Sequence, residues 1–96
     1  MAASAPQTVA LALGGPMTRA DLPALGERVT TLLGGGKAEV VLCDVADATA
    51  DAVTVDALAR VCLAARRHGC QTRVHGASRE LIALLDFVGL RDLARP

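Results

Sequence analysis

The chain has 96 residues, of which 52% are hydrophobic and only one is aromatic, so it is long enough for one domain with a core of aliphatic side chains. Ten basic residues balance ten acidic ones. Without a cationic surface or stacking aromatics, we expect no nucleic-acid binding. Three cysteines, no recognisable signal peptide and no apolar run of about 20 residues predict free thiols in a soluble cytoplasmic protein.

The N-terminal part predicts one strand and one helix. Residues 1–7 are expected to form a flexible tail, and residues 8–96 the domain. Large and small apolar residues alternate over 8–13, which predicts a strand with one packed face. Thr18 and Asp21 are candidate N-caps for the helix that follows. Its inner face is expected to contain the apolar residues that recur at helical spacing, namely Leu22, Leu25, Val29, Leu32 and Leu33.

The middle of the chain predicts a second strand and a second helix. The continuous apolar run at 40–43 indicates a central strand that is buried on both faces, as in a parallel sheet. The small and polar residues at 46–53 predict a loop, and a helix is expected from about Thr54 to His68. The inner face of this helix is expected to contain Val55, Leu58, Val61, Cys62 and Ala65.

The C-terminal part predicts a third strand at 71–75 and a third helix. Ser78 is the expected N-cap of that helix, and Gly89 is the expected glycine after its last turn. The buried stripe of this helix is expected to contain Leu81, Leu84, Leu85 and Val88. Strands that alternate with helices predict a single small α/β domain, with a largely parallel or mixed sheet and helices packed against it.

A glycine run at 34–36 precedes Lys37 and invites comparison with a phosphate-binding loop. Such a loop needs Gly-x-x-x-x-Gly-Lys-Ser/Thr between a strand and the helix that it opens. Here Thr31 occupies the first glycine position and Ala38 follows the lysine. The run also ends a helix, so its amides would not converge on a phosphate. We therefore predict no nucleotide site and no cofactor.

Other polar residues predict neither a metal site nor a catalytic site. Cys62, Cys70 and the histidines at 68 and 75 lack the paired cysteine spacing of a zinc site. No nucleophile elbow surrounds Ser78. The carboxylates around one loop lack the spacing of a calcium-binding loop; they are Asp44, Asp47, Asp51 and Asp56. We therefore expect that the chain is not an enzyme.

An ordered set of short segments runs through roughly the last 60 residues. It consists of Val-Val-Leu-Cys-Asp at 40–44, Asp-Ala-Val-Thr-Val at 51–55, Gly69, and Leu-Asp-Phe-Val-Gly-Leu at 85–90. This set resembles the STAS domain, the fold of bacterial anti-sigma factor antagonists. That family usually pairs two N-terminal strands in a mixed sheet. Pro6 interrupts the place for the extra strand, so we expect this strand to be short or missing.

The resemblance implies a docking module without chemistry of its own. In the family, the serine after the loop aspartate is phosphorylated by the anti-sigma kinase. Here Ala52 holds that position and has no hydroxyl. Thr54 is the nearest hydroxyl and is expected to be a helix N-cap, with a displaced phospho-acceptor as the alternative. The residues expected to bind the partner are Asp51, Ala52, Val53, Thr54, Asp56, Arg60 and Leu63.

Two partners stay open on this resemblance. The first is a kinase-type anti-sigma factor, which would make the chain a regulator of transcription. The alternative is the ATPase of an ABC-type phospholipid transporter, whose STAS subunits also lack the serine. A weak homodimer stays open, and no membrane insertion is expected. An outer row on the second helix is expected to be exposed, with Asp56 and Arg60 paired weakly; it consists of Asp56, Arg60, Leu63 and Arg67.

Overall fold

The computed structural model describes residues 7–36 and 38–90. Its elements follow one another as strand β1, the short 3₁₀ helix η1, helix α1, strand β2, helix α2, strand β3 and helix α3. Their bounds are Thr8–Ala12 for β1, Arg19–Asp21 for η1, Leu22–Leu33 for α1, Val40–Asp44 for β2, Ala52–Arg67 for α2, Gln71–His75 for β3 and Arg79–Phe87 for α3.

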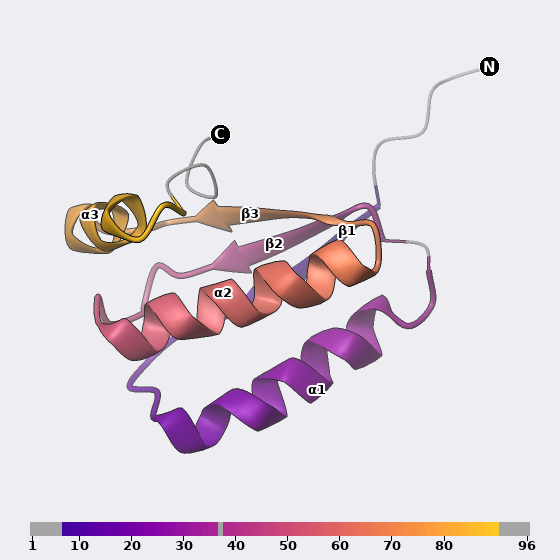
Figure 1. Cartoon of the computed structure of the whole chain (residues 1–96), viewed down its shortest axis with the longest axis horizontal. Coiled ribbons are helices and arrows are strands. Elements are labelled where there is room, and N and C mark those ends of the chain that lie inside the picture. Colours follow the sequence, from indigo (N-terminus) through magenta and orange to yellow (C-terminus); the bar gives the residue numbers. More distant parts are fainter. Residues whose placement is uncertain (1–6, 37, 91–96) are drawn as a thin grey trace.

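The three strands form one parallel sheet in the order β1-β2-β3, which confirms the predicted α/β class. Because each crossover moves one strand further in the same direction, right-handed connections place α1 and α2 on the same face of the sheet. Figure 1 shows both helices on that face, while α3 lies beyond the carboxyl end of β3 and beside α2. The carboxyl ends of the strands, the start of α2 and α3 thus share one end of the molecule.

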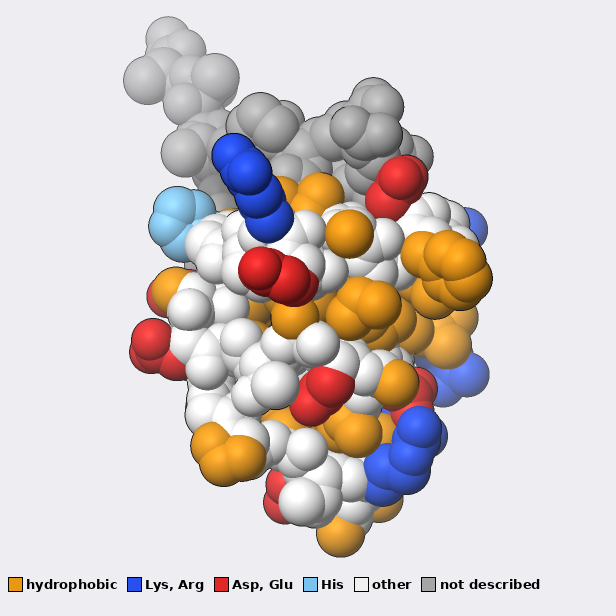
Figure 2. Space-filling model, turned by 90° about the vertical axis from the view of Figure 1, so that its left-hand side faces the viewer, with side chains coloured by type: hydrophobic (Ala, Val, Ile, Leu, Met, Phe, Trp, Pro, Cys, Tyr) orange, Lys and Arg blue, Asp and Glu red, His pale blue; other side chains and the backbone are white. Residues whose placement is uncertain are grey.

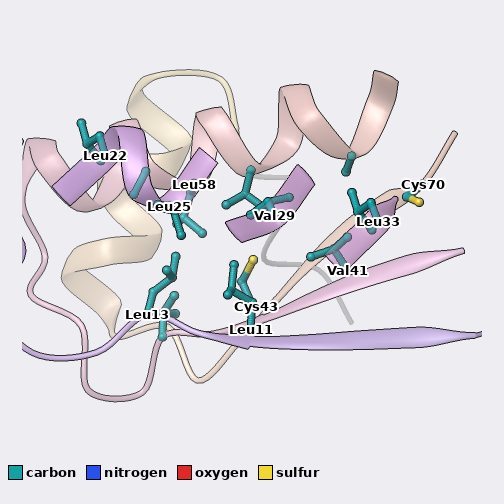
Figure 3. Close-up of a cluster of buried hydrophobic side chains, with 14 of the residues drawn as sticks. Leu11, Leu13, Leu22, Leu25, Val29, Leu33, Val41, Cys43, Leu58 and Cys70 are labelled. Carbon is teal, nitrogen blue, oxygen red and sulfur yellow. The ribbon is translucent and has the colours of Figure 1, made fainter. Parts of the chain in front are cut away.

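The core lies between the sheet and the two helices on its covered face. In β1 and β2, Leu11 and Cys43 are buried, and they point toward α1 and α2 (Figure 3). Leu25 and Leu58 meet them from the helices (Figure 3). The prediction that β2 is buried on both faces is wrong. Val40 and Leu42 alternate with the buried residues and are only half-buried, because no described helix covers the opposite face of the sheet.

In all three helices the predicted apolar stripe contains residues that the structure leaves exposed or half-buried. In α1, Leu32 is 41% exposed although its neighbour Leu33 and, one turn earlier, Val29 are buried. In α3, Val88 follows the last helical residue and is 50% exposed. In α2, Val55 and Cys62 are only half-buried. A helix in contact with one layer buries a stripe narrower than its whole apolar set, so the residues at the edge of the stripe stay in contact with water.

The ends of α3 follow the predicted signals. The side chain of Ser78 accepts a hydrogen bond from the backbone N–H of Leu81 at 3.1 Å. At the other end Gly89 has a φ of 83°, a left-handed conformation that glycine adopts without steric cost. This turn lets the N–H of Leu90 donate to the carbonyl of Leu85 at 2.7 Å.

The predicted N-terminal tail and the place where the family's extra strand would lie fall almost wholly outside the described residues. Gln7 is the exception. Its carbonyl accepts hydrogen bonds from the N–H groups of Glu39 and Val40, at 2.8 and 3.1 Å. The Gln7 carbonyl is therefore hydrogen-bonded to the segment that begins β2.

Thr72 in β3 has an unsatisfied hydroxyl group on the face of the sheet that the helices cover. Its Oγ1 atom is buried and has no hydrogen-bond partner in the described part of the chain. We expect Thr72→Val to raise the free energy of unfolding by about 1 kcal/mol, because valine has the same shape and removes an unsatisfied polar group. Urea unfolding checks this. The matched control is Thr31→Val at an exposed position, where no such gain is expected.

Candidate functional site

The start of α2 is held in place by the loop that leaves β2. The N–H of Val45 donates to the carbonyl of His75, and the N–H of Gly15 donates to the carbonyl of Asp47, both at 2.9 Å. Gly76, with a φ of 80°, lies so close to this loop that an added Cβ would be 3.0 Å from that of Ala46. The loop is therefore attached to the segments that follow both outer strands.

Asp51 is the N-cap of α2, and the prediction of Thr54 for this role is wrong. The Oδ1 atom of Asp51 accepts a hydrogen bond from the backbone N–H of Thr54 at 2.9 Å. Its carbonyl accepts another from the N–H of Val55 at 3.2 Å. Helix α2 begins at Ala52, two residues before the predicted start, because the cap is Asp51 and the first turn therefore starts directly after it.

The first turn of α2 separates the predicted docking residues into exposed and buried ones. Ala52 is exposed, and Asp51 and Val53 are half-buried. Thr54 is 3% exposed and points into the core side of the helix. A kinase would reach this threonine only after the first turn had opened, so we do not retain Thr54 as a modification site.

Asp56 lies at the centre of a small ion-pair network on the surface of α2. Its carboxylate contacts Arg60, one turn along the helix, at 3.3 Å, which confirms the predicted pair. It also contacts Arg19 of η1 at 3.2 Å. Both pairs are partly exposed, so each is worth less than about 1 kcal/mol. The network nevertheless attaches η1 to α2, a contact that no local sequence pattern indicated.

An apolar groove of about 630 Å³ lies between α2 and α3. Phe87, the one aromatic residue of the chain, is 88% exposed at its side. Figure 2 views the end of the molecule where α3 and the start of α2 lie, and hydrophobic side chains gather along the middle and one side of it. We call this hollow the α2–α3 groove; it is lined by Ala52, Val55, Asp56, Ala59, Leu84, Phe87, Val88 and Leu90.

A second groove of about 680 Å³ lies between α1 and α2. On the α2 side it is lined by Arg60, Leu63 and Arg67, and on the α1 side by Gly26 and Thr30 among others. Leu63 is 55% exposed there, as the outer-row prediction requires. The row therefore divides between two surfaces: its first member lines the α2–α3 groove, and its other members line this one.

The groups that invited a metal or nucleotide assignment make local structural contacts. No three His, Cys, Asp or Glu side chains within residues 7–36 and 38–90 are placed to hold a metal ion. The thiol of Cys70 is buried and donates to the carbonyl of Ala38 at 3.0 Å. The Nδ1 atom of His68 lies 3.0 Å from the carbonyl of Ala64. The glycine run at 34–36 follows the last residue of α1.

Cys43 is the most deeply buried thiol. Burial, and to a smaller extent the charge of the neighbouring Cys62, raises its pKa from 9.0 to about 12. Above pH 9 the unfolded chain loses this proton while the folded chain keeps it, so stability falls as pH rises from 9 to about 12. The slope reaches about 1.4 kcal/mol per pH unit.

Urea unfolding at a series of pH values checks this dependence. The chain has no tyrosine, so few other side chains titrate in the same range. Cys43→Val removes the thiol at similar volume and should make the profile flatter between pH 9 and 12. An equally steep profile in that variant would assign the titration to another group.

Comparison of the chain with models of known protein families and with curated proteins finds no match. None of the helices within the described residues combines the length and the hydrophobicity needed to span a membrane.

Proposed function

We propose that this chain is a non-catalytic docking module of the STAS type, which binds a protein partner through the start of α2. The observation that carries the proposal is the α2–α3 groove. Ala52, at the position of the family's phosphorylated serine, is exposed at its edge, and Phe87 is 88% exposed beside it. Exposed apolar surface that is rimmed by polar groups is typical of protein interaction sites.

The first turn of α2 supplies polar groups next to this apolar surface. Asp51 accepts hydrogen bonds from the N–H groups of Thr54 and Val55. The helix itself offers no acceptor to the N–H groups of Ala52 and Val53. A partner that inserts an apolar side chain into the groove would therefore find donors at one end of it. These features favour a partner whose surface has an apolar side chain that enters the groove and, next to it, a hydrogen-bond acceptor for the free N–H groups.

The favoured partner is a kinase-type anti-sigma factor, in line with the family resemblance of residues 40–90. Binding is expected to be constitutive, because Ala52 has no hydroxyl and Thr54 is buried. The alternative partner is the ATPase of an ABC-type phospholipid transporter. The absence of a hydroxyl at residue 52 favours this alternative, since such subunits resemble the chain in that respect.

Affinity capture with the whole chain as bait tests the proposal. Mass spectrometry should identify a small kinase-fold ATPase, or, for the alternative, an ABC ATPase. The identified protein is then purified, and its affinity for the chain is measured by calorimetry. Leu63→Asp serves as a second bait, because Leu63 lines the second groove, between α1 and α2, and the variant tests whether the partner also contacts that groove. Capture of neither ATPase class would contradict the proposed function.

A further inference from the structure

The α2–α3 groove has a shape that suits self-association. The ring of Phe87 projects on the α3 side of the groove. The α2 side is lined by the small side chains of Ala52 and Ala59, which lie on the same face of the helix, two turns apart. A protrusion and a hollow thus lie on the same patch. In a twofold contact the same patch serves both subunits, so a patch that contains both features is complementary to itself.

The charge of the patch is also compatible with a second copy. Residues near a twofold axis face their own counterparts, so a charged residue there would meet a like charge. Among the described residues that line the groove, only Asp56 is charged, and its carboxylate is already paired with Arg19 and Arg60. The chain has no formal net charge, so no long-range repulsion keeps two copies apart.

We propose that a second copy of this chain covers the α2–α3 groove, with the Phe87 ring of each copy seated in the groove of the other. One aromatic side chain buries about 150–250 Å². Two rings and the groove walls that they cover would therefore remove about 600–1,000 Å² from water. Stable interfaces bury about 1,200–2,000 Å². The contact is therefore a weak dimer that forms in a concentration-dependent way.

Such a dimer would also regulate the docking surface, a consequence that rests on the proposed function. Ala52 lines the groove that the second copy covers, so the dimer and the protein partner would compete for it. Self-association would then control access to a surface that has no phospho-acceptor at residue 52. Dimer formation itself is measured without any partner, so its failure is distinguishable from failure of the proposed function.

Sedimentation velocity of the whole chain over a hundredfold range of concentration tests the proposal. The wild-type chain should shift from monomer to dimer. Phe87→Ser should weaken the dimer at least tenfold, because it removes the protrusion. Ala59→Lys should have a similar effect, because it places a long charged side chain in the hollow. Thermal unfolding of each variant shows that it is folded.

Ile82→Ser is the matched control. Ile82 lies on the same helix and is 36% exposed, but it does not line the groove. This variant should keep the wild-type dimer affinity. A wild-type chain that stays monomeric over the whole range would overturn the proposal. So would an equal loss of dimer in the Phe87→Ser and Ile82→Ser variants, because the contact would then lie elsewhere on α3.

Discussion

Ala52→Glu is expected to weaken partner binding by about thirtyfold or more while the chain stays folded. An unpaired carboxylate at the edge of the α2–α3 groove would be desolvated in the complex, which costs about 2 kcal/mol or more. Folding should tolerate the change, because Ala52 is exposed and is the first residue of α2. A negative charge at a helix N-terminus is itself favourable.

Two controls separate the possible causes of such a loss. Ala52→Gln has nearly the same size as Ala52→Glu but no charge, so it distinguishes bulk from electrostatic repulsion. Ala52→Ser restores the family's hydroxyl and should keep the wild-type affinity. Calorimetry measures the affinity, and the melting temperature should stay within a few degrees in all three variants. Wild-type affinity in the Glu variant would place the docking surface elsewhere.

Leu58→Ala is expected to lower the free energy of unfolding by about 2–5 kcal/mol. Leu58 is 0% exposed and lies between α1 and the sheet (Figure 3), where the neighbouring layers leave it no contact with water. Domains of this size are stable by only about 5–15 kcal/mol. A single truncation at this position would therefore remove a large part of the total, and urea unfolding measures it.

Leu63→Ala makes the same chemical change on the same helix and serves as the control. Because Leu63 is 55% exposed, its truncation should cost less than about 1 kcal/mol. Helix propensity changes equally in both variants, so the difference between them reports core packing alone. Equal losses would mean that α2 is not packed with Leu58 toward the core.

The sequence by itself determined the elements and the signals at their ends. The strand at 71–75 has the predicted bounds, and Ser78 and Gly89 end α3 as expected. These features depend on residues within a few positions of one another, since a cap bonds the amides of its own first turn and a terminal glycine acts on its own φ. The same local logic predicted the pair between Asp56 and Arg60.

Only the tertiary structure decided which surfaces are free. Val40 and Leu42 belong to an apolar run, and their partial exposure depends on the absence of a described helix over that face. The contact between Arg19 and Asp56 joins residues 37 positions apart. Phe87 belongs to an apolar segment in the sequence, yet it lies outside the core because α3 turns its Leu81 and Leu85 inward. Burial depends on where neighbouring elements pack, and hydrophobic periodicity alone does not contain that information.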